Sequence, residues 1–569
     1  MQNLEIKVEF NVAVPMRDGT VLRADVYRPC VDQPVPTLLA RTPYDKWNYR
    51  APLLFCDPVR LARNGYAVVT QDCRGCGASD GEFYPFRHDA ADGYDSVEWA
   101  ANQPWSNQRV GMIGGSYLGS MQWMAANERP PHLATILPMM APLGVRGLMF
   151  RGGVFQLQTA QHWSLLMSGM LARRRLPGKE LGALMQAILV AMDHPEPERK
   201  HLPLNSWPTG RKAACMDFYF DFLAHPANDA YWHALESGSY ETPTVPVFVV
   251  GGWHDACMEA GELAGYMKMR ERSGTAANHV RLMVGPWIHD PMPAQSSGDI
   301  DFGILGSAVA IDLNGAYLRW LDYWLKDIDN GVMNEPPVRL FVMGTNIWRN
   351  ELEWPLARTQ YTKYYMHRDK TRASGFLDIE LPGSEAPDAY DYDPHDPVPT
   401  HGGRILATVM GPVNQAAIET RSDVLVYTTP PLAEDLEVTG PISVVLYAQS
   451  SAPDTDFTAK LVDVWPTGEA YILADGIVRA RYRDTERSPT PIDREKIYRY
   501  SIDLLATSNV FEAGHSVRLE ISSSNFPKYD RNLNTGQGIG DSAKIQIAHQ
   551  QIFHDGLRPS HVLLPIIPH

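Results

Sequence analysis

The sequence predicts an α/β domain that is interrupted by a helical insertion and followed by an all-β domain. Three observations lead to this prediction. Short apolar stretches alternate with helical stretches over residues 1–143 and again over 241–354. Helix-forming residues without a strand pattern occupy residues 144–240, and strand-like segments separated by Pro, Gly and Asp fill residues 355–569. Because 569 residues exceed what one hydrophobic core usually holds, several domains are expected.

The α/β pattern supplies the strands of a parallel sheet. Each candidate strand is a short, mostly apolar run, and stretches with helical spacing of their apolar residues lie between the strands. Strands that alternate with helices form parallel sheets covered by helices. The candidate strands are 21–27, 36–41, 66–72, 109–114, 245–252 and 279–286, and the candidate helices are 92–101, 258–272 and 314–326.

The other two regions depart from this pattern. Residues 165–170 and 181–192 are rich in Leu, Met, Ala and Gln, which favour helices, so residues 144–240 are predicted to form a helical cap spliced into the α/β domain. After residue 354 the helical pattern stops and alternating segments such as 442–448 take over. These segments predict a β-sandwich or jelly roll over residues 355–569.

Composition and charge disfavour some classes of partner. Apolar residues make up 44% of the chain and charged residues 21%, which is typical of a globular protein. The formal net charge of −15 argues against nucleic acid and anionic membranes as partners, since both require a basic surface. The first residues lack a signal-peptide pattern, and no apolar run approaches the ~20 residues of a membrane span. We therefore expect a cytoplasmic protein that acts on a small molecule.

The six cysteines are scattered and are expected to be free thiols. Cys73 and Cys76 have the spacing of a metal knuckle, but neither a second pair nor a nearby group of histidines accompanies them. We interpret them as loop residues, and a metal-binding or redox role is the alternative.

A serine in a glycine-rich turn is the candidate nucleophile. Ser116 follows the candidate strand 109–114 and precedes a helix that begins near Leu118. In α/β-hydrolases a strand–turn–helix elbow exposes the nucleophilic serine, usually as Gly-x-Ser-x-Gly. Gly114 fits this pattern, but the second glycine, Gly119, comes one residue late. A serine that only caps the helix is the alternative interpretation.

Two later strand ends supply partners for this serine. Asp255 follows the candidate strand 245–252, and His289 follows the candidate strand 279–286. α/β-hydrolases carry nucleophile, acid and histidine in this chain order. The predicted catalytic triad is therefore Ser116, Asp255 and His289, on an α/β-hydrolase fold.

Neighbouring ionisable residues are less well placed for catalysis. Asp290 is adjacent to His289 and would point elsewhere. Glu259 and Glu262 fall on the following helix, where a solvated face is expected. His254 is expected to line the substrate site or to bond a backbone carbonyl.

Five short motifs stand out along the chain: Arg-Thr-Pro-Tyr-Asp-Lys at 41–46, Asp-Cys-Arg-Gly-Cys-Gly at 72–77, Gly-Gly-Ser-Tyr-Leu-Gly at 114–119, Gly-Gly-Trp-His-Asp at 251–255 and Gly-Pro-Trp-Ile-His at 285–289. Together they resemble the cocaine esterase family of serine hydrolases. This family also contains X-prolyl dipeptidyl aminopeptidases, α-amino acid ester hydrolases and glutaryl cephalosporin acylases. The resemblance covers nearly the whole chain, and the family's elbow, Gly-x-Ser-Tyr-x-Gly, accounts for Gly119.

The resemblance implies a particular oxyanion hole. Its two donors would be the Tyr44 hydroxyl and the backbone N–H of Tyr117. It also implies an acyl-enzyme on Ser116, no metal or organic cofactor, and a homodimer.

The resemblance leaves the substrate class open. A carboxylic ester or an amide is expected, with α-amino acid ester hydrolysis, X-prolyl dipeptide release and β-lactam acylation as alternatives. Substrates with an α-ammonium group require acids in the site. The pair Asp217 and Asp221 is expected to be solvated, which favours a carboxylesterase or acylase. Trp163 of the cap is a candidate pocket residue.

A carbohydrate- or partner-binding module is the non-enzymatic alternative for the C-terminal domain. Jelly rolls often bind sugars, and Tyr447, Trp465 and Tyr471 could offer a stacking surface. Aromatic residues in a sandwich are more often part of its core.

Overall fold

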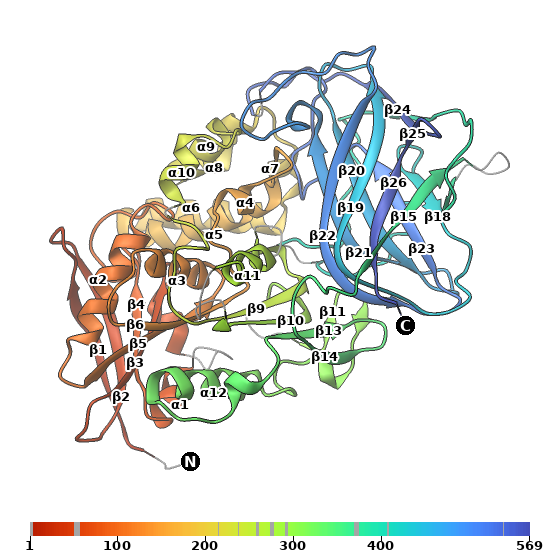
Figure 1. Ribbon diagram of the computed structural model, residues 1–569. Coiled ribbons are helices and arrows are strands. Elements are labelled where there is room, and N and C mark those ends of the chain that lie inside the picture. The colour runs from red at the N-terminus through yellow and green to blue at the C-terminus, as the bar shows by residue number, and fades with distance from the viewer. Residues whose placement is uncertain are drawn as a thin grey trace.

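The computed structural model shows a mixed α/β part and a β-rich part side by side, with the helices of residues 146–235 packed above the first (Figure 1). The structure describes residues 4–50, 57–213, 216–236, 238–257, 261–272, 278–290, 294–368, 375–406, 409–538 and 540–568.

A ten-stranded sheet forms the centre of the α/β part. The six pairings that join β4, β3, β5, β6, β9, β10 and β13 in this order are parallel, and the outer pairings are antiparallel. The strands in spatial order are β1 (Ile6–Pro15), β2 (Val21–Pro29), β4 (Ala67–Asp72), β3 (Val35–Thr42), β5 (Ser106–Gly115), β6 (Leu133–Met139), β9 (Val247–His254), β10 (Val280–Ile288), β13 (Val338–Val342) and β14 (Ile347–Glu351).

Helices cover both faces of this sheet, and their apolar faces bury it. Figure 1 places α1 (Pro58–Arg63) and α12 (Leu313–Lys326) on one face. The opposite face carries α2 (Asp89–Ala101), α3 (Tyr117–Asn127) and α11 (Glu262–Arg270). Because both faces are covered, β4 and β9 are buried along their whole length.

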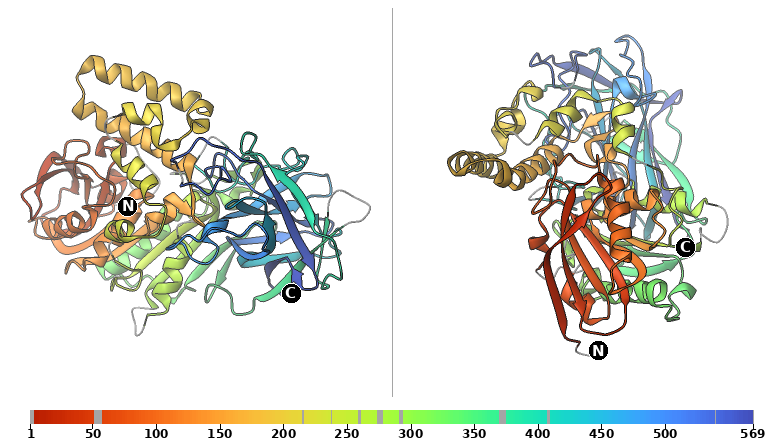
Figure 2. Two further views of the ribbon diagram at one scale, coloured as in Figure 1. Left: turned by 90° about the horizontal axis from the view of Figure 1, so that it is seen from above. Right: turned by 90° about the vertical axis from the view of Figure 1, so that its left-hand side faces the viewer.

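Helices dominate the segment between β6 and β9. The two longest of them, α5 and α6, lie side by side and project from the rest of the molecule (Figure 2). A two-stranded hairpin, β7 (Phe150–Arg151) and β8 (Val154–Phe155), precedes them. The helices are α4 (Arg146–Met149), α5 (Leu157–Arg175), α6 (Gly178–Asp193), α7 (Glu196–Lys200), α8 (Pro208–Lys212), α9 (Asp217–Ala224) and α10 (Ala230–Leu235).

The C-terminal part is a twelve-stranded sheet that encloses its own apolar core. Its pairings are antiparallel except the one between β16 and β18. The strands are β15 (Gln360–His367), β16 (Gly375–Asp378), β17 (Asp388–Tyr392), β18 (Leu425–Thr428), β19 (Leu436–Ser450), β20 (Asp456–Val464), β21 (Ala470–Arg479), β22 (Tyr498–Phe511), β23 (Ser516–Ser522), β24 (Ala548–Asp555), β25 (Arg558–Pro559) and β26 (His561–Ile566).

The order of elements confirms the predicted α/β part and β-rich part, but the sequence analysis missed four strands of the ten-stranded sheet. These are β1, β6, β13 and β14. Pro130 and Pro131 lie three and two residues before the start of β6, and Pro138 lies within it, so its sequence is typical of a loop. The tertiary structure overrides that preference because β6 fills the gap between β5 and β9.

The cysteines that the structure describes are free thiols, at positions 30, 73, 76 and 257. Cys56 and Cys215 lie outside the described residues. Cys73 and Cys76 are both buried, and burial raises the pKa of each thiol well above its ordinary value. A thiolate is therefore disfavoured at both positions, which weighs against the metal or redox alternative. Among the described helices, none combines the length and the apolarity that crossing a bilayer requires.

Candidate active site

Ser116 occupies a strained turn between β5 and α3. Its backbone has φ 58° and ψ −131°, a conformation that non-glycine residues rarely adopt. A Cβ at Gly114 would lie 2.6 Å from the Cβ of Leu118, and a Cβ at Gly119 would lie 2.4 Å from that of Ala141. Close packing therefore requires both glycines, including the one that comes a residue late. The strain and the packing together form an elbow, not a simple helix cap.

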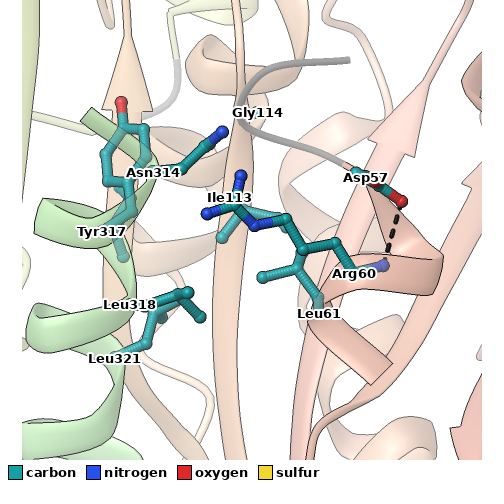
Figure 3. Close-up of a pocket in the computed structure, with 10 residues that line it drawn as sticks. Asp57, Arg60, Leu61, Ile113, Gly114, Asn314, Tyr317, Leu318 and Leu321 are labelled. Atoms are coloured by element: carbon teal, nitrogen blue, oxygen red, sulfur yellow. Dashed lines mark hydrogen bonds between the residues drawn. The ribbon is translucent and has the colours of Figure 1, made fainter. Parts of the chain in front are cut away.

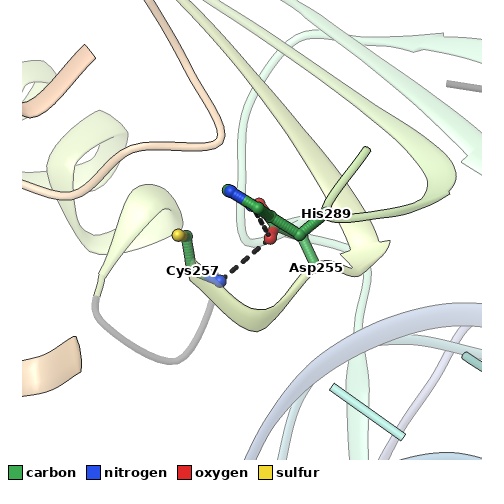
Figure 4. A group of neighbouring side chains, drawn as sticks. All are labelled: Asp255, Cys257 and His289. Atoms are coloured by element: carbon green, nitrogen blue, oxygen red, sulfur yellow. Dashed lines mark hydrogen bonds and ion pairs between the residues drawn. The ribbon is translucent and has the colours of Figure 1, made fainter. Parts of the chain in front are cut away.

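The structure brings Asp255 and His289 to Ser116 from two neighbouring strands. β9 and β10 are parallel, and Ile288 lies opposite His254, so the residues that follow each are adjacent. His289 Nε2 lies 3.0 Å from Ser116 Oγ, and His289 Nδ1 lies 2.7 Å from Asp255 Oδ1. Asp255 is fully buried, and its Oδ1 also accepts a hydrogen bond from the Cys257 amide at 2.9 Å. Asp255, Cys257 and His289 each offer an atom that could bind a metal ion, and these atoms lie within 4.8 Å of one another. Figure 4 shows the three side chains, two of which are joined by the His289–Asp255 hydrogen bond.

The environment of His289 makes its imidazole more basic. Burial lowers the pKa of His289, but the charge and hydrogen bond of Asp255 and the charge of Asp290 outweigh burial and raise it above its ordinary value. A buried carboxylate beside Nδ1 thus stabilises the imidazolium that forms when His289 accepts a proton.

The Tyr44 side chain lines the same pocket as Ser116. Burial raises the pKa of Tyr44 to about 12, so the hydroxyl keeps its proton at neutral pH. Trp163 Nε1 lies 3.1 Å from this hydroxyl and can only donate, so the Tyr44 oxygen accepts there and its own proton is available. A hydrogen bond with the Ser116 side chain acts to lower the pKa of Tyr44, but burial outweighs it.

A buried ion pair fixes the loop that carries Tyr44. Lys46 Nζ lies 2.8 Å from Asp72 Oδ2, and both side chains are fully buried. The Asp72 carboxylate also accepts from the Lys46 amide at 2.7 Å and from the Ala78 amide at 2.9 Å. These bonds join the loop after β3 to the loop after β4, so Tyr44 is held against the elbow.

Tyr117 presents its backbone N–H at the start of α3, and its side chain anchors it there. It is the first residue of α3, where N–H groups have no acceptor within the helix. Its hydroxyl donates to Asp89 Oδ2 at 2.7 Å and accepts from the Phe86 amide at 2.8 Å. Its ring stacks on those of Phe86 and Trp163, with centroids 4.3 and 6.0 Å away.

The pocket beside Ser116 is small and uncharged. Its volume is about 50 Å³, and its described lining contains no Asp, Glu, Lys, Arg or His. Trp163, the cap residue expected in the pocket, lies in this lining. Cys257 and, from the C-terminal part, Leu406 complete it. The sequence carried no signal for either contribution.

Arg404 ties the C-terminal part to the strand that carries the acid. This buried guanidinium donates to the Trp253 carbonyl at 2.9 Å, two residues before Asp255. It also donates to the carbonyls of Leu504 and Ala506 at 3.0 and 2.6 Å. The end of β9 is therefore held by a side chain more than a hundred residues further along the chain.

Several expectations about neighbouring residues need correction. His254 is buried at the end of β9 against Phe302 and does not belong to the described lining of the Ser116 pocket, so the structure disfavours a substrate contact. Burial, with the charge of Arg404, lowers the pKa of His254 to about 3. Glu262, expected to be solvated, is buried with 2% of its surface exposed, and Glu259 lies outside the described residues.

Other acidic and aromatic residues lie outside the described lining of the Ser116 pocket. Asp217 is exposed, whereas Asp221 is half-buried and accepts a hydrogen bond from the Tyr84 hydroxyl at 2.7 Å. Trp465 and Tyr471 pack edge to face, with centroids 5.0 Å apart, so their rings do not form one flat platform.

A second pocket lies on the other side of β5, between α1 and α12 (Figure 3). Gly114 lines it, so it backs onto the elbow. The described residues that line it include Arg60, Asn314 and Tyr317 but no serine, cysteine or histidine. Its described lining therefore offers neither a serine or cysteine nucleophile nor a histidine base.

Comparison with known proteins covers both parts of the chain. Residues 18–291 match the X-Pro dipeptidyl-peptidase (S15 family) model, and residues 330–563 match the X-Pro dipeptidyl-peptidase C-terminal non-catalytic domain. The chain is 39% identical over 579 aligned positions to the cocaine esterase of Rhodococcus sp. (strain MB1 Bresler), covering 98% of each chain.

Two solved structures share the whole fold. An aminopeptidase from a marine sediment Thaumarchaeota archaeon superposes with a TM-score of 0.81 at 26% identity, covering 100% of this chain and 97% of the other. An α-amino acid ester hydrolase superposes with a TM-score of 0.80, also at 26% identity, covering 99% and 97%. The likeness therefore extends over both the α/β part and the β-rich part.

Proposed function

The chain belongs to the cocaine esterase family of serine hydrolases, and from this membership we propose that it cleaves carboxylic esters through an acyl-enzyme on Ser116. The observation that carries the proposal is the continuous hydrogen-bonded chain from Ser116 through His289 to Asp255. A hydroxyl becomes a competent nucleophile when an adjacent base removes its proton. These hydrogen bonds hold His289 in the orientation that this base requires.

The reaction begins when Ser116 Oγ attacks the ester carbonyl and His289 Nε2 takes the hydroxyl proton. Asp255 stabilises the imidazolium and fixes its tautomer. The tetrahedral oxyanion accepts hydrogen bonds from the Tyr44 hydroxyl and the Tyr117 amide. His289 then protonates the leaving alkoxide, and the acyl group stays on the serine. His289 then takes a proton from water, which attacks the acyl-enzyme. His289 returns that proton to Ser116 Oγ as the acyl–oxygen bond breaks and the acid leaves.

Replacing Tyr44 by Phe tests the oxyanion hole. We expect kcat for p-nitrophenyl acetate to fall by about 10²–10³, because one donor to the oxyanion is lost. Steady-state kinetics of Tyr44→Phe check this, with Tyr94→Phe on α2 as the matched control. A rise in KM with an unchanged kcat would place Tyr44 in substrate binding instead.

The neutral pocket favours substrates with an uncharged acyl group. An α-ammonium group would need a carboxylate partner, because burying an unpaired charge is costly. The described lining of the Ser116 pocket contains no Asp or Glu. We therefore propose simple carboxylic esters as the substrate class, ahead of amino acid esters and X-Pro peptides.

A substrate panel tests this preference. We expect kcat/KM for p-nitrophenyl acetate to exceed that for the p-nitroanilide of Gly-Pro and for amino acid methyl esters. Prior treatment with a fluorophosphonate should abolish all three activities and label Ser116, as mass spectrometry of the peptides would show. Faster release from Gly-Pro would reverse the assignment in favour of the peptidase alternative.

We assign residues 1–143 and 241–354 to the catalytic domain, 144–240 to a helical cap and 355–569 to a jelly-roll domain. In support, β9 returns to the sheet beside β6 after the intervening helices. Trp163 of the cap and Leu406 of the C-terminal domain both reach the Ser116 pocket. This supports a C-terminal domain that completes the site, ahead of a detachable binding module.

A further inference from the structure

Three buried carboxyl oxygens behind the triad have no hydrogen-bond donor among the residues that the structure describes. They are Asp255 Oδ2 and both side-chain oxygens of Glu262. Asp255 is fully buried and Glu262 is 2% exposed, so neither carboxyl is solvated. The two side chains interact directly with each other.

The backbone of β9 makes room for the Glu262 carboxyl. Glu262 is the first residue of α11. A Cβ at Gly251 would lie 2.4 Å from Glu262 Oε2, closer than atoms can approach. The first glycine of the Gly-Gly-Trp-His-Asp motif therefore leaves the space in which this carboxyl reaches the acid of the triad.

Two adjacent buried carboxyl groups share one negative charge, because ionising both is very unfavourable. Asp255 Oδ1 accepts from His289 Nδ1 and from the Cys257 amide, and these bonds favour its ionised form. Neither Glu262 oxygen receives such a bond from the described residues, so we infer that Glu262 holds the proton. The N-terminus of α11 attracts negative charge, but none of its described residues donates a hydrogen bond to Glu262 that would offset the repulsion from Asp255.

We propose that Glu262 is a positioning residue of the triad: its neutral carboxyl donates a hydrogen bond to Asp255 Oδ2 and holds the Asp255 carboxylate against His289. This inference rests on the proposed function, since it assigns Asp255 as the catalytic acid. Burial and the charge of Asp255 raise the pKa of Glu262 well above its ordinary value, in agreement with a neutral form. Tyr240 also faces Glu262, and its hydroxyl accepts from the Leu143 amide at 2.7 Å.

The hydrogen bond has a consequence for His289. A donor at Oδ2 withdraws negative charge from Asp255 and so weakens its attraction for the imidazolium. Removing the donor therefore strengthens that attraction and raises the pKa of His289 further. The acid limb of the pH profile of kcat/KM then moves to higher pH, which simple loosening of the protein would not cause.

A pair of substitutions separates hydrogen bonding from packing. Glu262→Met keeps the volume but removes the donor, and we expect kcat to fall about ten- to a hundredfold. KM should change little, and the acid limb should move to higher pH. Glu262→Gln retains an N–H donor and should restore a kcat and a profile close to those of the wild type. Glu271→Gln at the end of α11, where the side chain is exposed, is the matched control.

Infrared difference spectroscopy provides a readout besides activity. The wild type should show the C=O band of a protonated carboxylic acid at neutral pH, and Glu262→Gln should lose this band. Thermal unfolding and stoichiometric fluorophosphonate labelling of Ser116 measure the folded fraction of each variant. Should Glu262→Met not fold, the Gln variant and the infrared band still decide the matter.

Several results would overturn the proposal. An unchanged kcat and pH profile in Glu262→Met would do so, as would a Gln variant as impaired as the Met variant, or the absence of the infrared band. The proposed function fails separately, if Ser116→Ala retains esterase activity.

Discussion

Ser116→Ala is expected to lower kcat for p-nitrophenyl acetate by about 10⁶-fold, leaving only the turnover that the oxyanion hole and binding support. The physical reason is that the alanine methyl group cannot form the acyl-enzyme, and His289 then has no hydroxyl to deprotonate. Steady-state kinetics and labelling with a fluorophosphonate measure the effect, and the variant should take up no label.

The control for this variant is Ser206→Ala, which removes an exposed serine hydroxyl from the helical segment between β6 and β9. It should hydrolyse the ester and take up the label as the wild type does. If Ser116→Ala kept near-wild-type activity, the nucleophile would have to be another residue and the proposed mechanism would be wrong.

Asp255→Asn is expected to lower kcat by about 10⁴-fold while leaving the geometry of the site intact. The amide cannot stabilise the imidazolium, and it favours the wrong tautomer of His289. The pH profile should change as well. His289 acts as a base only when neutral, so kcat/KM falls as the pH drops through its pKa. Asp255 raises that pKa above its ordinary value, which moves the acid limb of the wild type to higher pH. Without the carboxylate, the limb should move to lower pH.

Asp290→Asn makes the same chemical change beside His289 and serves as the matched control. Asp290 acts on His289 only through its charge, so its loss should have a much smaller effect on kcat and lower the pKa slightly. Comparable losses in the two variants would mean that Asp255 does not act as the orienting acid.

Local patterns in the sequence predict much of this site. The strand before Ser116 and the glycines around it define a strained turn, because only small residues can pack there. Parallel strands end at one edge of a sheet, so Asp255 and His289 could be placed beside the serine from chain order alone. The alternation of short strands with helices, and the strand-like segments that follow it, likewise indicate the two main parts of the molecule.

Side-chain direction and burial required the tertiary structure. Residues adjacent at a strand end point to opposite sides, so His254 turns into the interior while Asp255 meets His289. Glu262 sits on a short helix whose hydrophobic pattern is weak, and only the packing of α11 on β9 shows that its carboxyl is buried against the acid.

By itself, then, the sequence determined the alternation of elements and predicted the nucleophile and its chain-order partners, because these depend on local spacing. Only the tertiary structure decided that Arg404 and Leu406 reach the site and that Glu262 lies behind the acid. These contacts join segments far apart in the chain, and the local spacing of residues does not predict which distant surface will cover a given side chain.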